Sequence, residues 1–119
     1  MAALDTVQDY ITAARRLLQD TVATAYRYPD DNLVDALNLA LLETRRLRAD
    51  LFLKQNFTAP SFALPADLTK AVPMNVMYRN ALVYFMVGYM QLRDDESTTD
   101  SRAAALLGKF QGQLLSVTG

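Results

Sequence analysis

The most apolar stretch of this 119-residue chain reads MNVMYRNALVYFMVGYMQLR and covers Met74–Arg93. Apolar side chains occur on every turn of the helix that it predicts, and such a helix must be buried nearly all round. Three partner helices from a small domain can hardly enclose it, so we expect part of it to lie at an interface between subunits. Gly88 in its middle costs about 1 kcal/mol relative to Ala, which indicates that another backbone approaches closely there.

Apolar spacing and capping residues predict three more helices around this stretch. One covers about residues 6–22, where Thr6 and Asp9 form a loose capping box. Another covers about 31–49, with acids at its start and arginines in its last turns, as the helix dipole favours. The last covers about 100–116. The sequence therefore predicts one all-α domain over residues 1–119, four-helix bundle-like, with its third helix at about 74–93.

A long connection separates the second and third helices. Residues 50–73 contain three of the four prolines, and a loop of some 24 residues is far longer than a bundle needs. A short strand pair around 57–64 or one helical turn at 66–70 fits the local sequence. Long ordered loops tend to be functional, so we expect this one to pack on its own subunit or to reach a neighbour. Its candidate contact residues are Phe52, Phe57 and Phe62.

Composition excludes several classes of function. The chain has 12 Lys and Arg against 13 Asp and Glu, and neither Cys nor His. Thiolate nucleophiles, histidine bases and Cys- or His-ligated metals are therefore excluded. The near-neutral charge also argues against a dedicated nucleic-acid binder. We find no catalytic constellation in the sequence, and we expect a protein that is no enzyme and needs no cofactor.

The acidic stretch at residues 94–100 is the one candidate metal site. Its oxygen-bearing side chains alternate as in a calcium loop, but the central Gly and the terminal bidentate Glu of the EF-hand pattern are missing. A solvated turn between helices is favoured over a metal site.

Clustered arginines admit two interpretations. Arg15 and Arg16 could meet Arg45, Arg46 and Arg48 across an antiparallel helix pair and bind phosphate. Acids lie within one or two turns of each group, so ordinary ion-paired faces are favoured. In a ring of subunits around a DNA channel, the cluster of Arg45, Arg46 and Arg48 would face the DNA or a partner. The small electrostatic potentials of the individual subunits would then add up.

The tyrosines at helical spacing beside Leu and Met indicate core or interface packing more than base stacking. Tyr84 and Tyr89 are the two that we assign to an interface. The first nine residues show no signal peptide, and the longest uncharged helical run, residues 80–92, is too short to cross a bilayer. We therefore expect a soluble protein made in a reducing compartment.

Several strings resemble small tailed-bacteriophage head-to-tail adaptor (connector) proteins. The resemblance covers nearly the whole chain beyond about Tyr10. It is carried by YPDD at 28–31, DALN at 35–38, ETRRLRADLF at 43–52, MYRNALVY at 77–84, QLRDDE at 91–96 and SRAAALL at 101–107.

This resemblance implies a mostly helical subunit of a ring, usually of twelve copies, beneath the portal of the virion. Such a ring extends the DNA channel and docks the tail or the next neck protein. The implied partners are other copies of the chain, the portal protein and a tail-side protein, with DNA only as passing cargo and no membrane. The implied location is the virion neck, after synthesis in the host bacterial cytoplasm.

Two alternatives remain open from the sequence. One is a helical protein-binding or regulatory module of a bacterial or prophage complex. The other is an enzyme that uses a metal held by oxygen ligands in the acidic stretch. Self-association and portal binding separate the first from an adaptor, and metal titration tests the second.

Overall fold

The structure, a computed structural model, describes residues 4–22, 24, 26–64, 66–93 and 100–115. This part of the chain is mostly helical and contains no strand, so the predicted all-α class is confirmed. The helices match the predicted ranges with two exceptions: the first ends four residues early, and the third begins as an α-helix at Arg79, after a 3-10 turn, and not at Met74. In chain order they are α1 (Val7–Leu18), α2 (Asp30–Leu47), the 3-10 helices η2 (Ala49–Gln55) and η3 (Val76–Tyr78), α3 (Arg79–Arg93) and α4 (Asp100–Leu115).

Both ends of α1 are fixed by local hydrogen bonds. The capping box forms as predicted: the Asp9 amide donates to the Thr6 hydroxyl, and the Asp9 carboxylate accepts from the Thr6 amide at 3.0 Å. At the other end Gln19 takes a left-handed conformation, with φ 58°, and its amide donates to the carbonyls of Arg15 and Arg16. This turn ends the helix at Leu18, four residues before the predicted end at about residue 22.

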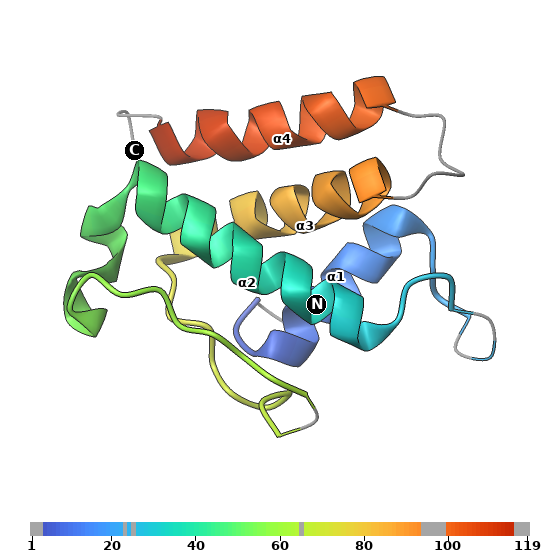
Figure 1. Cartoon of the computed structure of the whole chain (residues 1–119), viewed down its shortest axis with the longest axis horizontal. Coiled ribbons are helices and arrows are strands. Elements are labelled where there is room, and N and C mark those ends of the chain that lie inside the picture. The colour runs from blue at the N-terminus through green and yellow to red at the C-terminus, as the bar shows by residue number, and fades with distance from the viewer. Residues whose placement is uncertain (1–3, 23, 25, 65, 94–99, 116–119) are drawn as a thin grey trace.

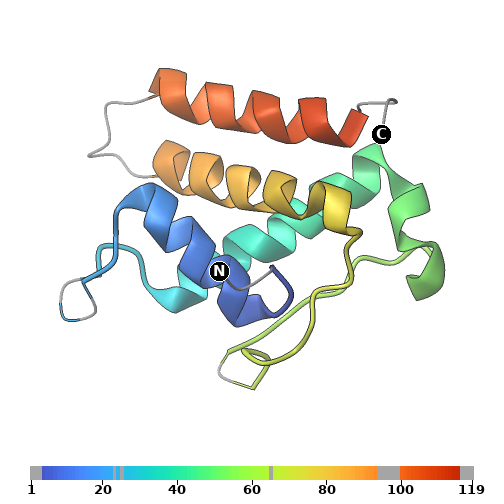
Figure 2. The ribbon, with the colours of Figure 1, turned by 180° about the vertical axis from the view of Figure 1, so that it is seen from behind.

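α3 lies at the centre of the molecule. α4 runs antiparallel along one side of it, and α1 and α2 cover the other side (Figures 1 and 2). We expected part of α3 to lie at an interface between subunits, on the premise that three partner helices can hardly enclose it. That premise is wrong. One chain covers most of α3, because α1, α2 and α4 all contact it. Of its apolar residues after Arg79, only Leu92 is more than half-exposed.

Gly88 lets α4 approach α3 closely, as its position in the sequence predicted. A Cβ placed on Gly88 would lie 3.0 Å from the Leu107 Cγ and 3.2 Å from the carbonyl oxygen of Ala103. Both contacts are shorter than ordinary van der Waals contact. The close spacing of α3 and α4 therefore depends on the absence of a side chain at Gly88.

The long connection packs on its own chain. Phe52, Phe62, Val72 and Met74 are all buried in the core. The Asn38 side chain of α2 holds the middle of the connection, because it both donates to and accepts from the Phe62 backbone, each at 2.9 Å. Of the two expectations for this loop, packing on the same subunit is therefore confirmed.

The later part of this connection lies against the start of α1. The predicted strand pair at 57–64 does not form there. The carbonyls of Lys70 and Leu68 instead accept from the Val7 and Gln8 amides, both at 3.0 Å, and the Val72 amide donates to Asp5. These bonds satisfy amides that the first turn of a helix leaves without partners. The Asp67 amide donates to the Ala63 carbonyl and the Lys70 amide donates to the Asp67 carbonyl, close to the predicted helical turn.

Candidate interaction surfaces

The three phenylalanines that we assigned to partner contacts lie in different environments. Phe52 is 0% exposed and Phe62 is 8% exposed, so both belong to the core of this chain. Phe52 has no exposed surface with which it could contact a partner. Phe57 is 46% exposed and has a left-handed backbone, with φ 61°. Of the three, only Phe57 has an exposed side chain that a partner could contact.

The two tyrosines are half-buried on α3. Tyr84 lies in a groove between α1 and α3, and the Nζ atom of Lys109 lies 5.5 Å from the centre of its ring. Tyr89 stacks on Phe85 with ring centres 6.0 Å apart, and Phe85 meets Phe110 of α4 edge to face. Tyr89 therefore packs on the ring that joins α3 to α4, and Tyr84, which lines the groove, is the better placed of the two for a partner.

The arginines at the end of α2 are engaged in different ways. Arg46 pairs with Glu43 at 2.8 Å, and Arg48 pairs with Asp50 at 2.8 Å and donates to the Leu114 carbonyl of α4. Hydrogen bonds from these guanidinium groups lower the pKa values of Glu43 and Asp50. Arg45 donates to the carbonyl of Phe57. The favoured interpretation, ordinary ion-paired faces, is confirmed for Arg46 and Arg48.

The structure does not bring the two arginine clusters together. Arg15 is buried, although it lies off the apolar stripe of α1 that helical spacing predicts, which consists of Val7, Ile11, Ala14 and Leu18. Its guanidinium pairs with Asp20 at 2.8 Å and with Asp30 at the start of α2, the end opposite to Arg45. A phosphate site shared by the two helices is therefore not formed.

The Asp20 carboxylate organises the connection between α1 and α2. Besides Arg15, it accepts from the amides of Arg27 at 2.8 Å and Tyr28 at 3.0 Å. The Tyr26 ring lies under the Arg15 guanidinium, with its centre 3.6 Å from Cζ. No spacing along the sequence indicates this role of Asp20, because its pairing depends on how residues 26–28 lie against the end of α1.

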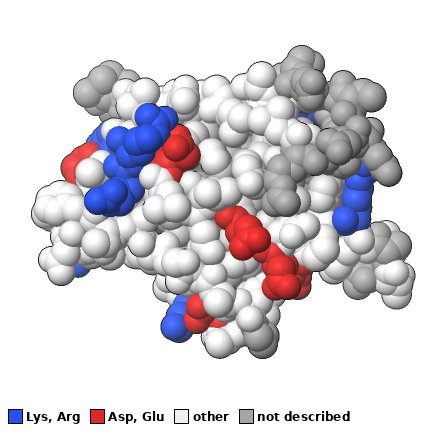
Figure 3. Space-filling model, in the orientation of Figure 1, with Lys and Arg blue, Asp and Glu red and all other residues white. Residues whose placement is uncertain are grey.

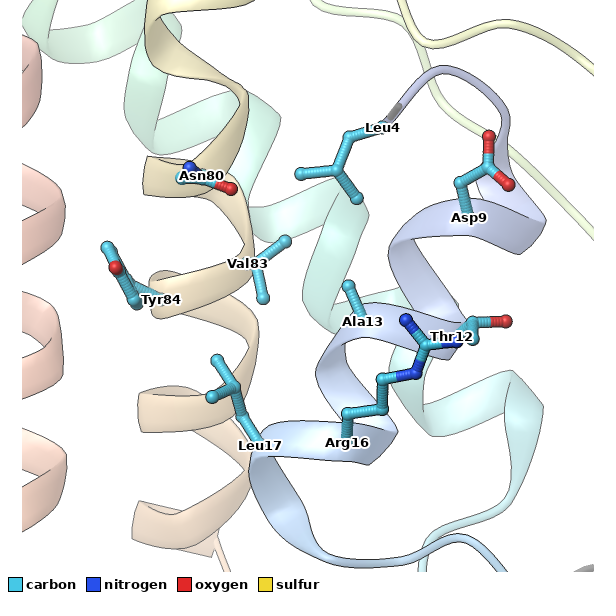
Figure 4. Close-up of a pocket in the computed structure, with 9 residues that line it drawn as sticks. All are labelled: Leu4, Asp9, Thr12, Ala13, Arg16, Leu17, Asn80, Val83 and Tyr84. Atoms are coloured by element: carbon cyan, nitrogen blue, oxygen red, sulfur yellow. The ribbon is translucent and has the colours of Figure 1, made fainter. Parts of the chain in front are cut away.

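A groove of about 390 Å³ lies between α1 and α3 (Figure 4). The apolar part of its lining comes from Leu4, Ala13, Leu17, Val83 and Tyr84, and the polar part from Asp9, Thr12, Arg16 and Asn80. On the helical spacing of α1, Leu17 lies beside the main apolar stripe and widens it. The apolar stripe of α1 is wider than the contact between α1 and α3. That excess width was the signal in the sequence for a groove.

The charges around this groove are unbalanced. The Asp9 carboxylate is committed to the amides of the capping box, and these hydrogen bonds lower the pKa of Asp9. Arg16 forms no ion pair within the part of the chain that the structure describes. Arg102 donates only to the carbonyl of Leu17, and Lys109 lies over Tyr84. Three cations that have no carboxylate partner among the described residues therefore lie at or beside an apolar slot.

The described residues contain no group of three or more acidic side chains that could hold a metal ion. Residues 94–99, and with them most of the acidic stretch considered as a metal site, lie outside the described residues, as does the side chain of Asp100.

No helix within the described ranges is both long enough and apolar enough to span a membrane.

Comparisons of the chain with protein-family models, with curated proteins and with solved structures gave no match.

Proposed function

We propose that this chain is a structural virion protein, a head-to-tail adaptor that acts without catalysis or a cofactor. In this proposal it is a four-helix bundle-like subunit of a ring, of twelve copies if it follows the proteins that it resembles. The ring docks under the portal, extends the DNA channel and connects to the tail or to the next neck protein. DNA passes through it without being recognised by sequence.

The strings that resemble adaptors carry the proposal, and their positions in the fold support it. YPDD supplies Asp30, which pairs with the buried Arg15, and ETRRLRADLF joins the end of α2 to the core residue Phe52. MYRNALVY includes the first turns of the central helix α3, and SRAAALL supplies Ala103 and Leu107, which pack at Gly88. The resemblance thus involves the residues on which the packing of this chain depends.

Exposed apolar side chains are a second support, because assembly proteins need surface that a partner can cover. Large apolar residues that are at least about one-third exposed occur on every α-helix and in the connections. They are Leu17, Val22, Tyr26, Leu42, Leu53, Phe57, Met77, Leu92 and Leu115.

The test of this proposal is assembly with the portal protein of the same genome. The two full-length proteins are co-expressed and analysed by size exclusion with light scattering. We expect a complex that contains the portal ring together with many copies of this chain. A chain that stays monomeric and leaves the portal ring unbound would rule out the adaptor and favour the helical regulatory module.

Phe57 and Phe62 provide a matched pair for the connection between α2 and α3. Phe57→Ala should weaken portal binding and leave the melting temperature nearly unchanged, because the ring is exposed. Phe62→Ala should lower stability by about 3–5 kcal/mol, because it empties part of the core. Equal portal binding by the Phe57→Ala variant and by the wild type would refute the assignment of Phe57 to the partner surface.

A further inference from the structure

We propose that the groove between α1 and α3 binds the outer face of α2 of a second copy of this chain. The inference deepens the proposed function and rests on it, since it assigns the contact between neighbouring subunits. It starts from two surfaces of one molecule that are complementary in charge and lie on opposite sides.

The groove favours an apolar occupant that carries carboxylates. Its lining includes Leu17, Val83 and Tyr84, and the nearby cations Arg16, Arg102 and Lys109 form no ion pair within the described ranges. Charges at the rim of an apolar patch steer and orient a partner of opposite sign.

The outer face of α2 offers these properties. Asp31, Asp35 and Leu42 lie on one stripe of the helix at i, i+4 and i+11, and all three are exposed, Leu42 by 53%. Neither aspartate forms an ion pair with a described residue. Figure 3 shows acidic side chains along the N-terminal half of α2, on the face toward the viewer.

The stripe on α2 is somewhat longer than the groove. At about 1.5 Å per residue, Asp31 and Leu42 are about 16 Å apart along α2. The α1 side of the groove, from Asp9 to Leu17, extends for about 12 Å on the same measure. One face of α2 can therefore place its apolar residue and at least one carboxylate along the groove.

The positions of the two surfaces determine the kind of assembly. α2 crosses the front of the molecule in Figure 1, whereas α1 and α3 lie in front of α2 when the molecule is seen from behind (Figure 2). In the close-up of the groove, α2 again lies behind these two helices (Figure 4). Two different surfaces on opposite sides give a heterologous contact, which produces a closed ring or an open chain of subunits.

Nucleic acid is a less suitable occupant. A phosphate backbone would place negative charge over a slot lined by leucine and valine, and beside the carboxylate of Asp9. Affinity for DNA depends on many neutralised phosphates, whereas the groove has three cations around an apolar surface.

Two variants, each with one disabled surface, test the proposal. Arg16→Glu reverses a charge at the groove, and Asp35→Arg reverses one on α2. Both positions are exposed, and thermal unfolding checks that each variant folds. We expect concentration-dependent oligomers of the full-length wild type in sedimentation velocity, and self-association at least about ten-fold weaker for each variant.

Mixing and combining the variants gives the decisive result. Arg16→Glu retains an intact α2 face and Leu42→Glu retains an intact groove, and their two disabled surfaces repel each other, so this mixture should form a 1:1 dimer that grows no further. Arg16→Glu together with Asp35→Arg in one chain should restore oligomers, because the charges are then exchanged. Leu42→Glu should disable the α2 face independently, and Lys54→Glu, at an exposed cation of η2, should behave as the wild type.

A monomeric wild type, or variants that assemble like it, would overturn the assigned contact. If adding DNA abolishes self-association, that result would instead assign the groove to nucleic acid. These outcomes are separate from the fate of the adaptor: normal portal binding by Arg16→Glu, with an intact ring, refutes the contact alone. A 1:1 dimer of Arg16→Glu with Leu42→Glu, with no binding to the portal, refutes the adaptor alone.

Discussion

The junction of α1 with α2 and the junction of α3 with α4 are held in opposite ways. At the first, a buried guanidinium joins Asp20 and Asp30, and Asp20 also binds two backbone amides. At the second, Gly88 lets the carbonyl of Ala103 and the side chain of Leu107 come close to α3. The first junction depends on charge and hydrogen bonds, and the second depends on volume.

This difference shows where each kind of substitution will act. A buried charge is costly to leave unpaired, and its partners cannot be replaced one at a time. A tightly packed helix pair tolerates changes in charge on its outer side, but it has no room for added carbon atoms. The predictions below test each junction with the change to which it should respond.

The largest effect is expected for Arg15→Ala. The variant leaves the buried carboxylate of Asp20 without its cation, and we expect a loss of about 3–5 kcal/mol in the free energy of unfolding, measured by urea titration. The neighbouring substitution Arg16→Ala is the control, and it should change stability by less than about 0.5 kcal/mol. Similar losses for both variants would mean that the buried pair does not hold this junction.

The next largest effect is expected for Gly88→Val. Its added carbons would lie against Leu107 and Ala103, so we expect a loss of about 1–3 kcal/mol and a lower melting temperature. Gly108→Ala is the matched control on α4, because a Cβ there would meet nothing within 4 Å. That variant should gain up to about 1 kcal/mol from helix propensity. A neutral Gly88→Val variant would show that the two helices are not tightly packed.

Asp9→Ala tests the start of α1 and predicts a dependence on pH. Hydrogen bonds from the backbone lower the pKa of Asp9 in the folded state, so its stabilising effect is present above the unfolded pKa, about 3.9, and is lost as the pH falls through the lowered value. At pH 7 we expect the variant to lose about 1 kcal/mol. At pH 2 the difference from the wild type in urea unfolding should shrink, and an undiminished difference would contradict the capping role.

The smallest effect is expected for Tyr10→Phe. The hydroxyl of Tyr10 is buried and has no hydrogen-bond partner among the described residues, and burial raises its pKa. Removing a polar atom without a partner should change the free energy of unfolding by no more than about 1 kcal/mol, toward greater stability. A loss above about 2 kcal/mol in urea unfolding would reveal that the hydroxyl is satisfied.

Local patterns of sequence determined the helices of this protein. Apolar periodicity placed four helices within a few residues of their observed ends, and the capping box of Thr6 with Asp9 forms as its spacing predicted. The role of Gly88 was also foreseen, since a glycine within an apolar helix is costly unless a backbone lies close. These features depend on residues a few positions apart, whose interactions the helix itself dictates.

Tertiary structure alone decided which residues became surface. Phe52 and Phe57 are five positions apart in one proline-rich connection, yet the first is fully buried and the second is half-exposed. Arg15 is buried because Asp20 and Asp30 converge on it from another segment, and no spacing along α1 encodes that meeting. The groove likewise needs α1 and α3, which are some 60 residues apart in the chain. Burial depends on contacts between distant segments, so the sequence determined the helices and only their packing determined the surfaces.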